Sequence, residues 1–200
     1  MQFKAEHISF RYTDKSPLIL EDVSLTIEAG ERVGIVGPSG CGKSTFAKIM
    51  AGYQKPVKGQ ILIDDVPMER KVFCPVQMIY QHPELAVNPR WKMKKTLNEC
   101  FEPDEYLLEQ MGIEKAWLNR WPSELSGGEL QRFCIARILA PQTKLLICDE
   151  ITTMLDVITQ AQIWKMLLEI ADERKMSMAI ITHNQALAEK VCTRIVRISD

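Results

Sequence analysis

A glycine-rich run ending in Lys-Ser-Thr is the part of this 200-residue chain best suited to bind phosphate. Glycine lets the backbone wrap tightly, so that successive N–H groups point inward at an anion. Lys43 would neutralise phosphate charge, and the Ser44 hydroxyl would ligate Mg²⁺. The alternative is an incidental glycine-rich turn, but the apolar strand before the run and the helical pattern after it favour phosphate binding. The run comprises Gly37, Pro38, Ser39, Gly40, Cys41, Gly42, Lys43, Ser44 and Thr45.

Two acids follow the apolar run Leu145–Cys148. A buried strand that ends in acids puts carboxylates at the sheet edge where such folds bind ligands. Asp149 is suited to hold Mg²⁺, usually through water, and Glu150 to orient or deprotonate an attacking water. The alternative is a pair of solvated acids at a strand end. It is less favoured because the same chain contains a run suited to bind phosphate.

A third pattern, LSGGELQR, places two glycines at the start of a predicted helix. Ser126, Gly127 and Gly128 would expose backbone donors and the positive end of the helix dipole to an anion. The simpler interpretation is a capped helix, with Ser126 as the cap and Glu129 completing a capping box. Both interpretations hold together, because a cap and an anion site use neighbouring groups.

The elements that must position these residues alternate between strands and helices. This alternation predicts an α/β protein with a mainly parallel sheet. Helices are predicted over 43–52, 126–139 and 156–175, and strands over 18–27, 32–36, 60–64, 76–80, 144–149 and 178–182. Residues 82–125 contain prolines, tryptophans and short helical patterns without long β-branched runs, so we expect a helical subdomain there.

The sequence resembles the ATP-binding cassette (ABC) ATPases, because LSGGELQR is similar to that family's signature motif. The resemblance extends over essentially the whole chain. The resemblance implies a single ABC ATPase domain over residues 1–200. It would have a P-loop NTPase core with a mainly parallel sheet, an N-terminal antiparallel β subdomain and an inserted helical subdomain at 82–125. Residues suited to nucleotide binding then appear in the family's order along the chain.

Four further residues take roles from the resemblance. Tyr12 would stack on adenine, although a lone Tyr at a strand end more often packs against neighbours. Gln81 matches the glutamine that touches Mg²⁺ and senses the helical subdomain. His183 matches the residue that contacts the γ-phosphate, although a lone His after an apolar strand is more often a core residue. Asp156 matches the D-loop, the loop that follows the catalytic Glu in the family.

The resemblance also implies partners and cofactors. Two cassettes would sandwich two ATP molecules head to tail, with Mg²⁺ held by Ser44, Gln81 and Asp149. Ser126, Gly127, Gly128 and Asp156 would face the ATP of the partner subunit. The partner is a second copy of the chain or a paralogue, and the complex would include transmembrane permease subunits and a substrate-binding protein. Catalysis would rest on Glu150 and His183.

Loop sequences such as QHPELAVNPRW and LDVITQAQIW are similar to those of the oligopeptide, dipeptide and nickel importer ATPases. Two departures stand out: Ile151 replaces a usual proline, and Met154 replaces a usual small residue. They put the stiffness of the D-loop and its packing across the dimer in question, and a degenerate site in a heterodimer is a further alternative. The chain also ends at Asp200, without the C-terminal extension that peptide importers often carry, so it is either naturally minimal or truncated.

Composition limits the remaining choices. Twenty-five basic and 26 acidic residues leave a net charge of −1, so we expect no nucleic-acid partner. The sequence contains no membrane-spanning run and no signal peptide, so we expect a cytoplasmic protein, peripheral on the inner face of the cell membrane. Six scattered cysteines are expected to be buried reduced thiols rather than disulfides or zinc ligands. The expected function is the ATPase subunit of an importer; the alternative is a soluble ATPase of DNA repair, chromosome maintenance or translation.

Overall fold

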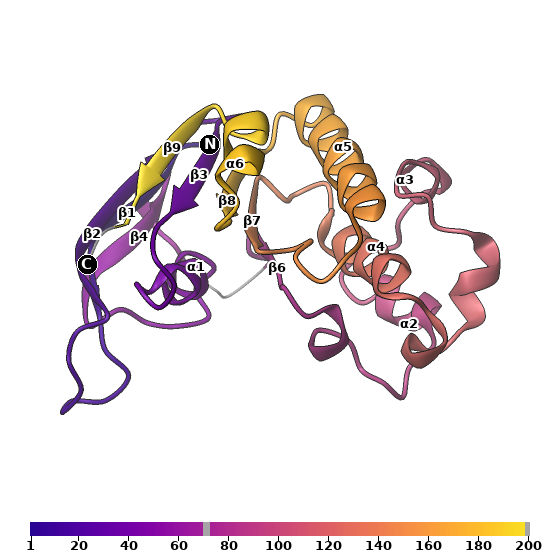
Figure 1. Cartoon of the computed structure of the whole chain (residues 1–200), viewed down its shortest axis with the longest axis horizontal. Coiled ribbons are helices and arrows are strands. Elements are labelled where there is room, and N and C mark those ends of the chain that lie inside the picture. The colour runs from indigo at the N-terminus through magenta and orange to yellow at the C-terminus, as the bar shows by residue number, and fades with distance from the viewer. Residues whose placement is uncertain (70–72, 199–200) are drawn as a thin grey trace. The chain divides into compact units, whose positions relative to one another are not determined.

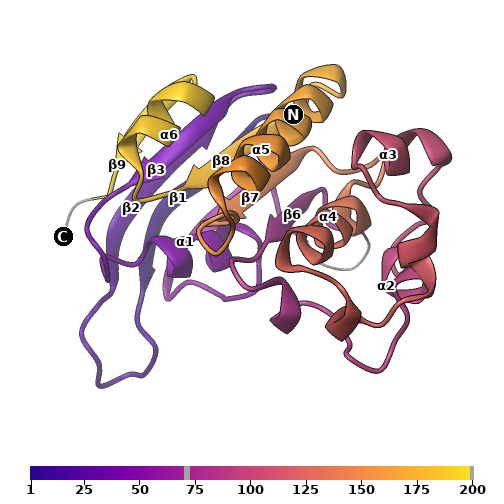
Figure 2. The same ribbon diagram turned by 45° about the vertical axis from the view of Figure 1, so that its right-hand side comes forward.

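The computed structural model describes residues 1–69 and 73–198, which form two compact units. The first unit comprises residues 1–78, 144–150 and 175–200, and the second comprises residues 79–143 and 151–174. Figure 1 labels the elements of both units, and Figure 2 shows them from a second direction.

The first unit contains an antiparallel sheet of four strands in the order β2-β1-β4-β5. In β1, the side chains of Phe3, Ala5 and Ile8 are buried, which gives this sheet an apolar inner face. The register shifts between Ala5 and Ile8, where His7 has a positive φ of 52°. The strands are β1 (Phe3–Phe10), β2 (Leu20–Ile27), β4 (Lys58–Ile63) and β5 (Val66–Pro67).

A second sheet has the strand order β6-β7-β8-β3-β9. The pairs β7–β8, β8–β3 and β3–β9 are all parallel, and every residue of β7 and β8 is buried. The prediction of a mainly parallel sheet beside an N-terminal antiparallel one is therefore confirmed. The strands are β3 (Arg32–Val36), β6 (Val76–Ile79), β7 (Leu145–Asp149), β8 (Ser177–Ile181) and β9 (Arg194–Arg197).

Two helices pack on this second sheet. Helix α1 (Lys43–Met50) contacts β7 and β8, and α6 (Gln185–Val191) contacts β3 (Figure 2). Because α1 follows β3 through the glycine-rich run, the phosphate-binding candidates lie at the carboxyl end of β3. The predicted strand–loop–helix context of this run is thus present.

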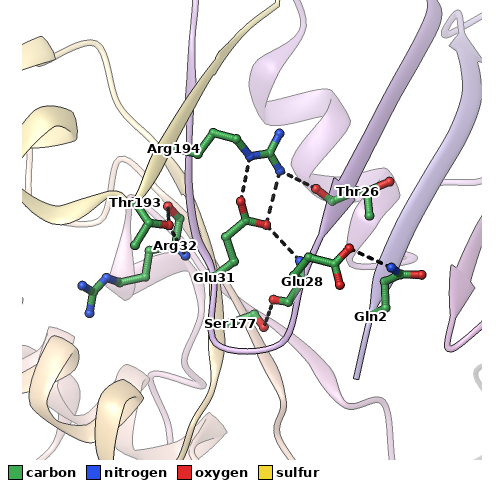
Figure 3. A network of polar contacts seen from close by, with 8 residues as sticks. All are labelled: Gln2, Thr26, Glu28, Glu31, Arg32, Ser177, Thr193 and Arg194. Atoms are coloured by element: carbon green, nitrogen blue, oxygen red, sulfur yellow. Dashed lines mark hydrogen bonds and ion pairs between the residues drawn. The ribbon is translucent and has the colours of Figure 1, made fainter.

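A polar network fixes the opposite end of β3 (Figure 3). The guanidinium of Arg194 in β9 donates from Nε to Glu31 Oε1 over 2.7 Å and from Nη2 to the carbonyl of Thr26 over 2.6 Å. Arg194 also holds the pKa of Glu31 below its ordinary value. Ser177 Oγ accepts from the N–H of Gly30 and donates to the carbonyl of Glu28. These bonds hold the turn before β3 against β8 and β9, so the strand that carries the phosphate-binding run is fixed at its base.

The second unit is helical. It contains α2 (Met93–Leu97), α3 (Glu105–Gln110), α4 (Gly127–Ile138), α5 (Val157–Glu173) and the short 3-10 helices η1 (Pro83–Leu85), η2 (Lys115–Asn119) and η3 (Pro122–Glu124). Helix α2 packs against α4 and η2. All the helices of residues 82–125 belong to this unit, whereas the exact limits 82 and 125 of the subdomain stay a prediction.

Three of the cysteines, Cys41, Cys134 and Cys148, are buried. Burial raises the pKa of the Cys134 thiol to about 11 and that of Cys148 higher still, so both stay protonated at neutral pH. Cys100 is exposed, and the expectation of a buried thiol is wrong there.

Candidate nucleotide site

The phosphate-binding run enters α1 through Gly42, which is the N-cap and has a φ of 93°. A side chain at this position would be strained, and its Cβ would lie 2.8 Å from Leu20 Cδ2. No side chain caps α1, so its first N–H groups remain available to an anion. The backbone of this run is therefore suited to hold phosphate oxygens.

Lys43 lies inside the loop that it follows. Its side chain is buried, and Nζ donates to the carbonyls of Gly37 at 2.9 Å and Pro38 at 2.7 Å. These contacts hold the ammonium close to the backbone N–H groups of the same loop. A bound phosphate would thus meet a positive charge and a helix N-terminus together.

Ser44 and Asp149 form the candidate magnesium pair. Ser44 Oγ donates to Asp149 Oδ1 over 3.1 Å, and Asp149 is buried at the end of β7. Burial raises the pKa of Asp149, and the neighbouring charge of Glu150 acts in the same direction, whereas the bond from Ser44 opposes them. A divalent cation would relieve this unfavourable buried charge. Two oxygen ligands fit Mg²⁺, which keeps several waters and binds nucleotide phosphates.

Glu150 and His183 face each other at the neighbouring strand ends. Glu150 follows β7, its N–H donates to the carbonyl of Ile181 at the end of β8, and its φ is 50°. His183 Nδ1 lies 3.3 Å from Glu150 Oε1, and the His183 side chain is exposed. A non-glycine residue rarely adopts such a φ, and strained residues of this kind are concentrated at functional sites.

Tyr12 lies beside the same loop. Its hydroxyl is 3.0 Å from Thr45 Oγ1, and its ring meets Phe10 edge-on with the ring centroids 5.2 Å apart. Tyr12 is 58% exposed, so much of its side chain is accessible to a ligand. The contact with Thr45 was not foreseen from the sequence, since nothing in the local pattern around Tyr12 points to Thr45.

A cavity of about 360 Å³ joins several of these groups. Its lining includes Tyr12 and Glu150, together with Ser39, Gly40, Gly42, Lys43, Ser44 and Thr45 of the loop and the start of α1. The first unit thus brings together an aromatic ring, a buried cation, backbone donors and acids.

The second unit gathers four other candidates around a cavity of its own, also of about 360 Å³. Ser126 caps α4, accepting from the N–H of Glu129, while the Glu129 carboxylate accepts from the N–H of Ser126; the predicted capping box is confirmed. Asp156 caps α5 and accepts from the N–H groups of Ile158 and Thr159. The cavity is lined by Ser126, Gly127, Gly128 and Asp156, among other residues.

Gly128 is required by this arrangement, because a Cβ there would lie 2.6 Å from Thr159 Cγ2. Sequence reasoning did not single out Thr159. Its position three residues after the cap Asp156 was the available signal, since the residue at N3 meets the capping side chain.

Gln81 belongs to the second unit, and its Nε2 donates to Thr153 Oγ1 over 3.1 Å. This bond ties Gln81 to the loop 151–156 that precedes α5. The metal role expected of Gln81 stays a prediction.

The sequence and the fold are both similar to those of known proteins. The family model described as ABC transporter matches residues 20–153. This chain belongs to the ABC transporter family. The nickel import system ATP-binding protein NikE of Staphylococcus aureus is 36% identical over 208 residues, covering 98% of this chain and 85% of the relative.

Solved structures agree with this assignment. One is cbiO1 from Clostridium perfringens, part of the ABC transporter complex cbiONQ, with a TM-score of 0.81 at 25% identity over 98% of this chain and 83% of that one. Another is a dimeric bacterial ABC transporter cassette, with a TM-score of 0.80 at 25% identity over 98% and 93% of the two chains. The protein is therefore an ATP-binding and ATP-hydrolysing ABC cassette.

Two features are absent from the described part of the chain. Among residues 1–69 and 73–198, no cluster of three or more His, Cys, Asp or Glu side chains is arranged to hold a metal ion. Over the same residues, no helix of this ABC cassette has both the length and the apolarity needed to cross a membrane.

Proposed function

We propose that this cassette drives an ABC importer for nickel, peptides or a related small solute. The observation that best supports ATP binding is the cavity of the first unit, which joins the phosphate-binding run, Tyr12 and Glu150. The import direction and the solute are inferred from the 36% identity to NikE, whose name gives a nickel import system.

Lys43, Ser44 and Asp149 would bind the nucleotide and its Mg²⁺. Phosphoryl transfer requires mainly positioning and charge neutralisation from the protein. Lys43 would supply the positive charge on the phosphates, and the Ser44–Asp149 pair would supply oxygen ligands. Bound Mg²⁺ would neutralise charge on the phosphate oxygens.

Glu150 and His183 would handle the attacking water. Glu150 would accept its proton, and His183, 3.3 Å from Glu150 in the structure, would help to orient the reacting groups. Tyr12 would stack on adenine. Gln81 would couple the helical unit to the metal site.

A second cassette would complete each site. Ser126, Gly127, Gly128 and Asp156 line one cavity, and this shared position is what a surface facing a partner's nucleotide requires. The N–H groups at the start of α4 would then donate to that nucleotide. Permease subunits and a substrate-binding protein would complete the importer.

The test begins with ATP turnover. Lys43→Ala should abolish hydrolysis and weaken ATP binding, whereas Glu150→Gln should bind ATP and accumulate as a dimer with ATP and Mg²⁺. Turnover near wild type in Glu150→Gln would contradict the role given to this carboxylate. Lys55→Gln, an exposed substitution outside the cavity, is the matched control.

The second step is recovery of partners from detergent-solubilised membranes of the source organism. Glu150→Gln serves as bait with ATP and Mg²⁺, and Lys43→Ala as the parallel control. Recovery of a multi-span permease by the first bait supports the proposal. Recovery of ribosomes, DNA or only membrane-free proteins would contradict a transporter role.

A further inference from the structure

The helical unit carries a basic and aromatic surface that the nucleotide chemistry does not use. From Leu85 to Asn98 the sequence contains four positive charges and no Asp or Glu. The whole chain has a net charge of −1, so setting these four charges aside leaves −5 for the rest. We name this surface the basic-aromatic face; it consists of Arg90, Trp91, Lys92, Lys94, Lys95 and Trp121.

The four cations of the face are exposed on an ordered support. Met93, Thr96 and Leu97 on α2 are buried, and α2 packs against α4 and η2, while Lys94 and Lys95 point to solvent. The N–H of Arg90 donates to Asn88 Oδ1, which fixes the turn before α2. The charges are therefore presented by a folded surface rather than by a free tail.

Two lysines lie over tryptophan rings. Lys95 Nζ is 4.2 Å from the centroid of the Trp91 ring, and Lys92 Nζ is 5.8 Å from that of Trp121. Both distances lie in the range of cation–π attraction. Trp121 is 41% exposed, so apolar ring surface and positive charge occur side by side.

Two carboxylates that lie close in sequence to members of the face have other partners. Glu99 Oε2 pairs with Arg137 Nη1 over 3.1 Å, and Glu124 Oε2 accepts from the N–H of Trp121. Among the described residues, none of the four cations of the face has a carboxylate within ion-pair distance. The face therefore presents unneutralised positive charge on an otherwise acidic chain.

We propose that the basic-aromatic face lies against the anionic headgroups of a lipid membrane. Tryptophan is enriched at membrane interfaces, and Lys or Arg close to an anionic leaflet adds attraction. A broad anionic surface offers more than one point of attraction to four exposed cations that lie within six residues of sequence. The acidic remainder of the chain would be repelled from it, which orients the protein. The proposal rests on the proposed function in one respect, since a permease would keep the cassette beside a membrane.

The test is sedimentation of the purified full chain with vesicles of phosphatidylcholine alone, or of phosphatidylcholine mixed with phosphatidylglycerol. We expect binding to the mixed vesicles only, weakening at high ionic strength. Each cation near such a surface contributes about fivefold to the partition coefficient, so Lys92→Gln/Lys95→Gln should bind about 25-fold more weakly.

The matched control is Lys55→Gln/Lys58→Gln, which removes the same charge from exposed positions of the first unit. It should bind like the wild type. Lys94→Glu is a second variant, whose exposed side chain has no cation–π contact with a described ring. It should weaken binding while ATP turnover in solution and thermal unfolding stay unchanged.

Equal binding to both kinds of vesicle, no binding, or equal loss in the control variant would overturn the proposal. Absence of vesicle binding together with loss of the permease from Lys94→Glu pull-downs would instead assign the face to an acidic protein segment. If vesicle binding fails while Glu150→Gln still recovers a permease, the lipid contact is wrong and the proposed function stands.

Discussion

A buried hydrogen bond helps to hold the loop between Glu150 and α5, and removing its acceptor should destabilise the protein measurably. Trp164 Nε1 donates to Thr152 Oγ1 over 3.1 Å, and the two residues are 6% and 3% exposed. The N–H of Leu155 in turn donates to the Thr152 carbonyl. Thr152 therefore fixes both the loop and its attachment to α5.

Thr152→Val keeps the shape of the side chain and leaves the indole N–H buried without its acceptor. An unsatisfied buried donor costs about 1–3 kcal/mol. A loss of about 2 kcal/mol corresponds to a fall in Tm of about 4–8 °C for a domain of this size. Thr152→Ser retains the hydroxyl and is the matched control.

The assay is thermal and urea unfolding followed by circular dichroism, combined with a double-mutant cycle using Trp164→Phe. We expect the double variant to be more stable than the sum of the single losses by about 1–2 kcal/mol, because the second change removes a group already left unsatisfied. ATP turnover should fall while ATP affinity holds. Strictly additive losses, or a Thr152→Val variant as stable as Thr152→Ser, would refute the reasoning.

Three further changes test the site. Asp149→Asn should stop Mg²⁺-dependent turnover yet raise Tm at neutral pH. Burial raises the pKa of Asp149 in the folded state. The stability contributed by the protonated carboxyl is therefore fully present below its unfolded-state pKa and is lost as the pH rises through its folded-state pKa. The gain in Tm from Asp149→Asn should therefore shrink in acid, and a gain that stays constant across pH would refute this cause. Tyr12→Ala should weaken ATP binding about fivefold, as expected for a lost ring contact, and Tyr12→Phe should not; equal equilibrium dissociation constants for the two variants would exclude stacking. Ser126→Ala should lower the free energy of unfolding by about 1 kcal/mol through the lost cap, whereas Ser126→Thr should retain most of it; urea unfolding measures both, and no difference between them would contradict the cap.

The elements around the site were predictable because their signals are local. The five residues of β7 are all buried, as the continuous apolar run ending at Asp149 predicts. The box between Ser126 and Glu129 spans three positions, which a reading of consecutive residues can detect. The limits of the strands and helices predicted by residue range differ from the observed ones by at most two residues, within the usual uncertainty of helix and strand ends.

Contacts between distant parts of the chain were not predictable in the same way. Tyr12 meets Thr45, and Thr152 meets Trp164, through packing that no short pattern encodes. The positive φ of His7 accompanies a shift of register between β1 and its neighbours, which the alternation of the strand does not reveal. Such features depend on how whole strands and helices pack, since register and bulges are set by both partners.

The replacement of the usual proline by Ile151 acquires a physical explanation from the same contacts. A proline would stiffen the loop by fixing φ. Here the Ile151 side chain is 2% exposed, so burial anchors the start of the loop. Gln160 Nε2 donates to the Leu155 carbonyl over 2.8 Å, and Gln81 donates to Thr153 over 3.1 Å. Packing and side-chain hydrogen bonds therefore restrain the loop in place of the proline ring.

Met154 differs from Ile151 in that its side chain is 62% exposed. It lines the same cavity as Ser126 and Asp156, the residues proposed to face the partner's nucleotide. A flexible thioether adapts to irregular surfaces, so a partner cassette can pack against it without close complementarity. Glu150 and His183 remain paired in the first unit. The departures from the family pattern thus lie in how the loop is held and in the surface proposed to face a partner. Both proposed reacting groups are present, which argues against a degenerate site.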